Sequence, residues 1–466
     1  MRLRFDQGSL VVDPEGVEKL PSCVRWDPRV GLWRALAMHF FDLRAFCRAG
    51  GVPFAAEFLP FATLQKKIGS SRVSPLLRAF QEEALAAWRV EKGRGVVILP
   101  TGAGKTRLAV EAIGRTSRSA LVVVPTLELL AQWYSVLSES FGGEVGRLGG
   151  GEHEIRPLTV TTYDSAYRWI DRYGDRFALL VFDEVHHLPA PSYVQIAQMS
   201  VAPFRLGLTA TFERGDFRHV PLSEWVGPVV YRRSIDELSG EALASYRTEI
   251  RKVEMTVVEK EEFETQDRIY RTYLRQAGIR GRKAFDSLLD LAARDGRAWR
   301  ALAAHRRARR VVAGASAKVE LVGELLGQYA DSKILIFTEY NDLVYRLSKE
   351  YLIPAITHLT SPKERRWILS SFREGKIRAI VTSKVLNEGV DVPEADVAIV
   401  LGGSGSRREH VQRLGRILRP LPGKEALLIE VITKAERGLS YRRRNDSAFR
   451  RKRPAAQQEL LFNAHQ

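Results

Sequence analysis

The sequence is poor in cysteine and in long apolar runs. Only Cys23 and Cys47 occur among its 466 residues, too few for a cysteine-ligated metal cluster or a disulfide framework. No stretch reaches the roughly 18 apolar residues of a membrane-spanning helix. Residues 1–20 are too charged for a secretion signal. We therefore expect a cytoplasmic protein with no membrane association and no structural disulfide.

Acidic residues are scarce relative to basic ones. The chain has 55 Asp and Glu against 72 Lys and Arg, which gives a formal net charge of +17. This excess favours an anionic polymer partner, most simply nucleic acid, over the alternative of a merely basic surface. Residues 441–453 (YRRRNDSAFRRKR) concentrate the charge. A phosphate-binding tail and a disordered charged terminus both fit that composition.

The stretch 99–106 (LPTGAGKT) is the most informative feature that is present. It connects an apolar run at 95–99 (GVVIL), typical of a buried parallel strand, to a helical pattern at 107–113 (RLAVEAI). A glycine-rich turn between a strand and a helix is typical of a phosphate-binding loop. An ordinary strand–turn–helix connection is the alternative.

The residues of this loop match the chemistry of a nucleoside triphosphate. Backbone N–H groups of such a turn surround phosphate oxygens, Lys105 neutralises the β- and γ-phosphates, and the Thr106 hydroxyl holds Mg²⁺. Leu99 replaces the leading glycine of the strict motif, and Gly102 and Gly104 supply the flexibility instead. The loop therefore predicts binding and hydrolysis of a nucleoside triphosphate.

Apolar runs that alternate with helical patterns indicate two α/β regions with parallel sheets. The expected strands of the first region are 95–99, 120–124, 158–161, 179–182 and 205–208, and those of the second are 333–337, 378–381, 397–401 and 426–431. A helix should begin after Ser361, which precedes Pro362. Only the first region has a phosphate loop, which suggests one nucleotide cleft shared by both.

The remaining segments differ in composition from these α/β regions. Residues 1–68 hold a strand candidate at 9–12 and an amphipathic stretch at 32–47. Residues 236–316 lack strand-like runs and are rich in Arg, Glu and Ala, so we expect helices only. A solvated helical linker and a DNA-contacting insert are the alternatives. The expected organisation is 1–68, 75–235, 236–316, 317–440 and the tail 441–466.

Two carboxylates follow the apolar run at 179–182 (LLVF). A carboxylate at a strand end beside a phosphate loop is where Mg²⁺ is held, so Asp183 is the candidate ligand. Glu184 is the candidate to orient or deprotonate the attacking water; an acidic helix N-cap is the alternative reading. His186 and His187 have no further ligand set beside them, so they fit coupling of the nucleotide site to the next segment better than a metal.

Arg416 and Arg419 lie in 412–419 (QRLGRILR). A spacing of three places both on one face of a helix. Arginines that reach a γ-phosphate from another lobe stabilise transition-state charge and are worth about 10³–10⁵ in kcat. The alternative is a basic surface helix.

In chain order, these motifs resemble superfamily 2 helicases. The first lobe carries LRAFQ (77–81), PTGAGKT (100–106), VVPT (123–126), TYDSA (162–166), DEVHH (183–187) and TAT (209–211). The second carries VTSKVLNEGVDVP (381–393) and QRLGRILR (412–419). Over about 1–433 the chain is similar to the XPB helicases, particularly the compact archaeal-type ones. The diagnostic stretches are 183–214, LIPAITHLTS (352–361) and GSGSRREHVQRLGRILRP (403–420).

The resemblance implies two RecA-like lobes with ATP at their interface, an N-terminal damage-recognition-like domain and a helical thumb-like insert. It assigns ATP binding to Arg78, Gln81 (adenine), Thr101, Gly102, Ala103, Gly104, Lys105, Thr106, Gly389 and Asp391. It assigns catalysis to Lys105, Asp183, Glu184, Arg416 and Arg419, and Mg²⁺ to Thr106 and Asp183. It assigns coupling or DNA contacts to Thr126, Thr162, Thr209, Thr211, Arg214, Asp216, Ser383 and Gln412.

The implied activity is that of an ATP-dependent DNA helicase or translocase in repair, with 3′-to-5′ polarity. We expect a monomer that acts on single-stranded or forked DNA. One departure concerns the Arg-Glu-Asp element of the family, which is linked to duplex opening and here reads Arg214-Gly215-Asp216. The alternatives are a duplex translocase without net unwinding, an ATP-switched platform that positions a repair nuclease, and an RNA helicase.

Overall fold

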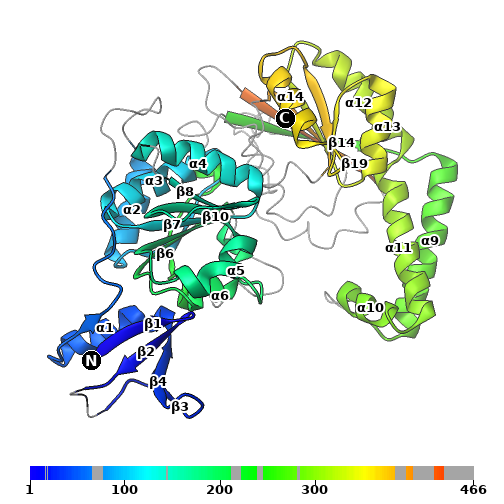
Figure 1. Cartoon of the computed structure of the whole chain (residues 1–466). Helices are drawn as coiled ribbons and strands as arrows, with labels where there is room; N and C mark the ends of the chain where they lie inside the picture. The colour runs from blue at the N-terminus through cyan, green and yellow to red at the C-terminus, as the bar shows by residue number, and fades with distance from the viewer. Residues whose placement is uncertain are drawn as a thin grey trace, which may run out of the picture. The chain divides into compact units, whose positions relative to one another are not determined.

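The computed structural model describes residues 1–65, 77–142, 145–210, 222–238, 245–280, 284–383, 395–401 and 425–434, except 16 and 18. The α/β fold expected from the sequence is confirmed, with two predominantly parallel sheets and a smaller N-terminal sheet (Figure 1). The described chain divides into two compact units. Most of the first unit is Met1–Tyr246, and most of the second is Arg247–Lys384.

The N-terminal sheet is small and largely antiparallel. Its strands are β1 (Arg2–Asp6), β2 (Ser9–Asp13), β3 (Arg25–Asp27), β4 (Leu32–Leu36) and β5 (Ala55–Ala56), in the order β3-β4-β2-β1-β5. The stretch 32–47 is not one amphipathic element: it divides into β4, the 3₁₀ turn η1 (Ala37–His39) and α1 (Phe40–Ala49). Leu10, Phe40 and Leu43 are fully buried in the core, which also takes in Val201 of the following domain.

The large sheet of the first unit has the order β13-β6-β12-β11-β7-β10-β8-β9. Its strands are β6 (Arg94–Ile98), β7 (Ala120–Val124), β8 (Val145–Gly149), β9 (Glu152–His153), β10 (Leu158–Thr162), β11 (Leu179–Asp183), β12 (Phe204–Thr209) and β13 (Val229–Arg232). Every pairing is parallel except that of β8 with β9. The five expected strands are present within one residue at each end.

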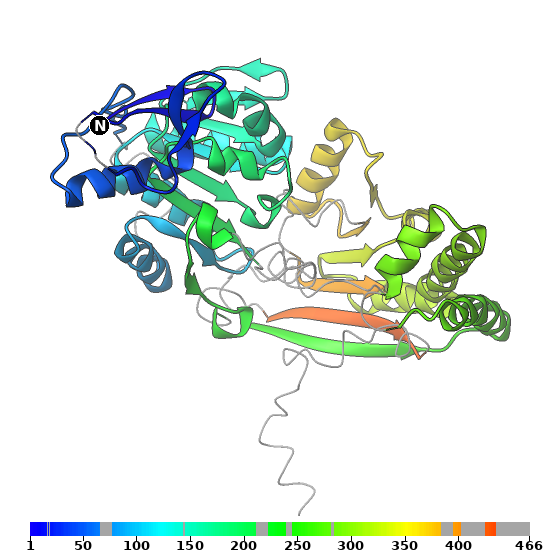
Figure 2. The same ribbon diagram turned by 90° about the horizontal axis from the view of Figure 1, so that it is seen from below.

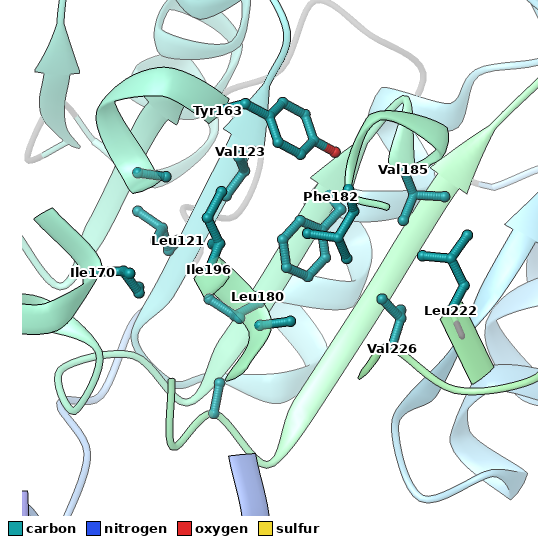
Figure 3. Packing of buried hydrophobic residues seen from close by; sticks show 14 of the residues in the cluster. Leu121, Val123, Tyr163, Ile170, Leu180, Phe182, Val185, Ile196, Leu222 and Val226 are labelled. Carbon is teal, nitrogen blue, oxygen red and sulfur yellow. The ribbon is translucent and has the colours of Figure 1, made fainter. Parts of the chain in front are cut away.

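Helices pack on both faces of this sheet. The helices of this part of the chain are α2 (Ala79–Val90), α3 (Lys105–Thr116), α4 (Leu127–Phe141), α5 (Tyr163–Tyr173), α6 (Val194–Gln198), α7 (Leu222–Trp225) and α8 (Ile235–Leu238), with the 3₁₀ turn η2 (Val185–His187). One core cluster joins α5, α6 and α7 to alternate residues of the central strands (Figure 3). In this cluster the rings of Tyr163 and Phe182 stack, with their centroids 6.4 Å apart. This packing fixes β11, the strand that ends in Asp183.

The second unit contains a six-stranded sheet in the order β14-β19-β18-β15-β17-β16. Its strands are β14 (Ser245–Val253), β15 (Ile334–Thr338), β16 (Ala355–Ile356), β17 (Ala379–Thr382), β18 (Val397–Leu401) and β19 (Glu425–Thr433). Three helices belong to it: α12 (Ser316–Gln328), α13 (Asn341–Tyr351) and α14 (Pro362–Arg373). The predicted helix start is confirmed, because the Ser361 hydroxyl accepts a hydrogen bond from the Glu364 N–H at 3.2 Å.

The expectation that 236–316 contains no strand is wrong. β14 lies within that segment and joins the edge of the sheet beside β19 (Figure 2). Its sequence, SYRTEIRKV, is highly charged, and even Ile250 is 46% exposed. An edge strand held by backbone pairing needs no apolar face, so it leaves no hydrophobic alternation to detect.

The rest of this segment is helical. Helices α9 (Val257–Gln276) and α11 (Gly296–Ala313) lie side by side, with α10 (Ala284–Ala292) packed on α11 (Figure 1). Leu288, Ala298, Ala301 and Leu302 form the buried centre of this helical insert. No helix in the described part of the chain is both long enough and apolar enough to cross a membrane.

His305 is a partly buried histidine on α11 of the helical insert. Its ring lies 4.4 Å from that of Tyr270 between centroids. Burial lowers the pKa of His305 to about 4, and the charges of Arg309 and Arg306 act in the same direction, against Asp267. The folded imidazole therefore stays neutral where an unfolded chain, with a histidine pKa near 6.5, already binds a proton.

We expect the stability of the insert to fall as the pH drops from about 6.5 to 4, because the unfolded state then takes up the extra proton. His305→Phe keeps an aromatic ring against Tyr270 and removes this loss. The melting temperatures at pH 7 and pH 5 measure it, with substitution of the exposed His358 to Phe as the control. Equal losses for the wild type and His305→Phe would contradict the assignment.

Candidate active site

The parallel strands bring three predicted elements to one edge of the first sheet. β6, β12 and β11 are consecutive neighbours, so their carboxyl ends lie side by side. The loop at 99–104 follows β6, Asp183 ends β11, and Thr209 ends β12. The next strands, β7 and β10, lead to Thr126 and Thr162 at the same edge.

The phosphate loop has the conformation that its glycines allow. Gly102 and Gly104 have φ angles of +86° and +82°, in the left-handed region that favours glycine. Gly104 is the N-cap of α3, so the first N–H groups of that helix face the loop. The Lys105 ammonium donates to the Leu99 carbonyl at 3.2 Å. The Thr101 hydroxyl is buried with no hydrogen-bond partner in the described part of the chain.

Gln81 holds this loop from the side. It is 2% exposed, and its Oε1 accepts from the Arg78 N–H at 2.9 Å. Its Nε2 donates to the carbonyls of Ala103 at 2.9 Å and Gly104 at 3.2 Å. The side chain expected from the resemblance to contact adenine thus links α2 to the phosphate loop. Nothing in the spacing of the sequence indicates these contacts.

Asp183 is buried and held by hydrogen bonds to three groups. Its Oδ1 accepts from the Glu184 N–H at 3.0 Å, and its Oδ2 accepts from Trp133 Nε1 at 2.9 Å. The Tyr163 hydroxyl donates to the Asp183 backbone carbonyl at 3.0 Å. Burial raises the pKa of Asp183 to about 6; Glu184 adds to this rise, and the Lys105 charge opposes it. The carboxylate and the Lys105 ammonium therefore share one site.

Sequence reasoning missed Trp133 and Tyr163 as partners of Asp183. Tyr163 lies within the TYDSA motif, in which Thr162 is the predicted functional residue. Trp133 lies on the buried face of α4 with the neighbouring Leu130 and Leu137. An indole at such a position looks like an ordinary core residue, because the pattern does not show where its N–H points.

Glu184 and the turn that follows link Asp183 to the end of β12. Glu184 has φ +47°, an unusual backbone conformation for a non-glycine residue. His186 is 1% exposed, and its Nδ1 lies 3.0 Å from Thr209 Oγ1 and 3.4 Å from Glu184 Oε2. The coupling that the sequence favours for His186 thus has a direct path to Thr209.

The predicted DNA contacts that the structure describes are at element ends. Thr126 and Thr162 are the N-caps of α4 and α5, and their hydroxyls accept from the N–H groups of Leu129 and Ser165. Ser383 is buried just after β17 in the second unit. The remaining predicted residues lie outside the described ranges: Thr211, Arg214, Gly215, Asp216, Gly389, Asp391, Gln412, Arg416 and Arg419.

The described residues fit a nucleotide with its metal ion. The positive-φ loop and the start of α3 offer backbone donors to phosphate oxygens, and the Thr101 hydroxyl is buried without a partner in the described chain. Oxygen ligands suit Mg²⁺, and Asp183 with Thr106, the second residue of α3, supplies them. Such a site can perform metal-assisted phosphoryl transfer to water.

Three family descriptions match successive parts of the chain. Residues 3–57 match the Xeroderma pigmentosum group B helicase damage recognition domain. Residues 74–214 match the family "Type III restriction enzyme, res subunit", and residues 317–420 match the helicase conserved C-terminal domain. In fold the chain is similar to Dbp5 of S. cerevisiae, with a TM-score of 0.51 at 16% identity over 76% of this chain and 83% of that one.

Whole proteins give stronger matches. The chain is 41% identical over 428 residues to the DNA 3′-5′ translocase XPB2 of Sulfurisphaera tokodaii, which covers 90% of this chain and 95% of the relative. It is 30% identical over 362 residues to the DNA 3′-5′ helicase XPB of Mycobacterium tuberculosis, covering 75% of this chain but 59% of that longer protein. The chain therefore belongs to the XPB family of superfamily 2 helicases and is an ATP-dependent DNA helicase of that family.

Proposed function

We propose that this chain moves 3′-to-5′ along DNA, using Mg²⁺-dependent ATP hydrolysis, in the service of DNA repair. The polarity is supported by the names of relatives, one of which is matched over 95% of its length. The repair role is supported by the damage-recognition match at residues 3–57. The observation that carries the proposal is the arrangement of the phosphate loop, Asp183 and Glu184 at one sheet edge.

The ATP site would use its residues in distinct roles. The loop 101–104 and the start of α3 would bind the phosphates. The Lys105 ammonium would leave the Leu99 carbonyl and bind phosphate oxygens instead. Thr106 and Asp183 would hold Mg²⁺, which neutralises phosphate charge when bound. Glu184 orients the attacking water. Its neighbours Thr209 and His186 are placed to respond when that carboxylate changes its contacts.

Residues of the second RecA-like lobe would complete the chemistry. We propose Arg416 and Arg419 as arginine fingers, and Gly389 and Asp391 as residues that help close the cleft. Gln81 of α2 would contact adenine, and Arg78, the N-cap of that helix, would also bind ATP. The proposed boundaries are 1–68, 75–235, 236–316, 317–440 and 441–466, with the first as damage-recognition-like domain and the third as thumb-like insert.

The strand-binding face would begin at the helix N-termini of the first lobe. α4 and α5 begin after Thr126 and Thr162, and helix N-termini attract phosphate groups. Ser383 and Gln412 would contribute from the second lobe, and Thr209 and Thr211 would couple hydrolysis to lobe movement. The net charge of +17 supports an anionic partner of this kind.

Translocation without net unwinding is the second candidate. The observation that favours it is Gly215, which stands where the family's Arg-Glu-Asp element has its middle carboxylate. Arg214 and Asp216 keep the flanking charges. A repair nuclease partner remains a proposal that rests on the family resemblance.

Loss of the phosphate-loop charge or of the fingers should stop the motor. Lys105→Ala is expected to abolish ATPase activity, and Arg416→Ala or Arg419→Ala to reduce kcat for ATP hydrolysis by about 10³-fold or more. ATP hydrolysis by each variant is compared with that of the wild type.

The nucleic acid on which the chain acts is tested by ATP hydrolysis with single-stranded DNA, duplex DNA, forks and RNA, together with strand displacement on forked DNA. DNA-stimulated hydrolysis without displacement selects the translocase. Stimulation by RNA alone contradicts the proposal.

The phosphate loop should not tolerate a side chain at Gly104. A Cβ there would lie 2.5 Å from Gln81 Nε2, in a backbone conformation of φ +82°. Gly104→Ala should therefore weaken ATP binding by at least tenfold, measured by titration with a fluorescent ATP analogue. Gly151→Ala is the control, because Gly151 has φ +93° with no atom within 4 Å of its Cβ position. Equal affinities for both variants would contradict the predicted clash.

A further inference from the structure

Trp133 of α4 contacts the carboxylate of Asp183, the proposed metal ligand. Its indole N–H has one hydrogen to donate, and that hydrogen goes to Oδ2 of Asp183 at 2.9 Å. The other carboxylate oxygen takes the Glu184 N–H at 3.0 Å. Two donors from different elements, one on each oxygen, fix the rotation of the carboxylate plane. Each oxygen keeps a further lone pair with which to bind a cation.

The indole is itself held in place. Trp133 is 1% exposed, and Leu130 and Leu137, both fully buried, lie on the same face of α4. α4 packs on β7, β8 and β10 and against α3, the helix that starts with Lys105. The ring therefore cannot turn away from Asp183 without opening the packing between α4 and the sheet. The Tyr163 hydroxyl also holds the Asp183 backbone, because it donates to the Asp183 carbonyl.

Hydrogen bonds that fix the direction of a carboxylate matter when that carboxylate binds Mg²⁺. Mg²⁺ demands near-ideal octahedral geometry and tolerates little error in ligand direction. Groups that hydrogen-bond a ligand from behind set its orientation, and their loss costs about 10–100-fold in metal affinity. A purely structural tryptophan would need only a backbone carbonyl as its acceptor. Trp88 of α2 is such a case: it is 3% exposed and donates to the Arg205 carbonyl at 2.9 Å.

We propose that Trp133 is a positioning residue that orients the Asp183 carboxylate for Mg²⁺ in the nucleotide site. This inference rests on the proposed role of Asp183 as the Mg²⁺ ligand. It predicts that loss of the indole N–H weakens Mg²⁺ binding and leaves metal-free nucleotide binding intact, since within the described residues the indole N–H donates to Asp183 and not to the phosphate loop.

The test compares Trp133→Phe with Trp88→Phe in the full chain. Each variant removes one buried indole N–H from the same lobe. The affinity for a fluorescent ADP analogue is measured in EDTA and across a MgCl₂ titration. For Trp133→Phe the half-saturating MgCl₂ concentration should rise about tenfold or more, while the affinity in EDTA stays within twofold. For Trp88→Phe both values should stay within twofold of the wild type.

Benzothienylalanine at position 133 covers the case in which Trp133→Phe does not fold. It keeps the shape of the ring and replaces only the N–H, so it should show the same rise in MgCl₂ requirement. An unchanged MgCl₂ requirement in this variant, or equal shifts for both phenylalanine variants, overturns the inference. Asp183→Asn tests the underlying assignment separately: if its nucleotide affinity still responds to MgCl₂ as in the wild type, Asp183 is not the ligand and the proposed function fails at that residue.

Discussion

The site depends on the burial of one carboxylate at the end of a parallel strand. Asp183 closes β11 between β12 and β7, and its position there leaves it 7% exposed. Burial favours the neutral form of the carboxyl and raises the pKa of Asp183 to about 6. If Asp183 holds a metal ion, as proposed, its charged form must therefore be stabilised locally. The Lys105 charge, the Trp133 indole and the Glu184 N–H together provide that stabilisation.

Sheet order explains why residues far apart in sequence meet at this carboxylate. β6, β12, β11 and β7 are neighbours in space although helices α3 to α6 lie between them along the chain. Parallel pairing places every carboxyl end at one edge, so the phosphate loop, Asp183, Thr209 and Thr126 gather there without any long loop. The helices also position side chains at the site, because α2 brings Gln81 to the phosphate loop and α4 brings Trp133 to Asp183, the proposed metal ligand.

The sequence predicts this frame well because its strands are continuous apolar runs, such as 120–124, which the structure places at the same residues. It also predicts the phosphate loop and the two carboxylates, whose spacing carries their chemistry. It fails where no periodicity exists. β14 is a charged edge strand, and the segment 32–47 changes from strand to helix within one amphipathic stretch. The partners Gln81–Ala103 and Trp133–Asp183 depend on side-chain direction across the fold, which spacing along the chain does not contain.

The position of Trp133 on α4 joins the two functions expected of the first lobe. α4 begins at its N-cap Thr126, a predicted DNA contact, and Trp133 lies about two turns further along the same helix. A helix packed along its length moves as a body rather than residue by residue. A phosphate bound at its N-terminus would therefore act on the same rigid element as the indole that donates to Asp183. If Thr126 contacts DNA and Asp183 holds Mg²⁺, as proposed, a shift of α4 on DNA binding would also act on the Trp133–Asp183 hydrogen bond, and so on the geometry of the metal site.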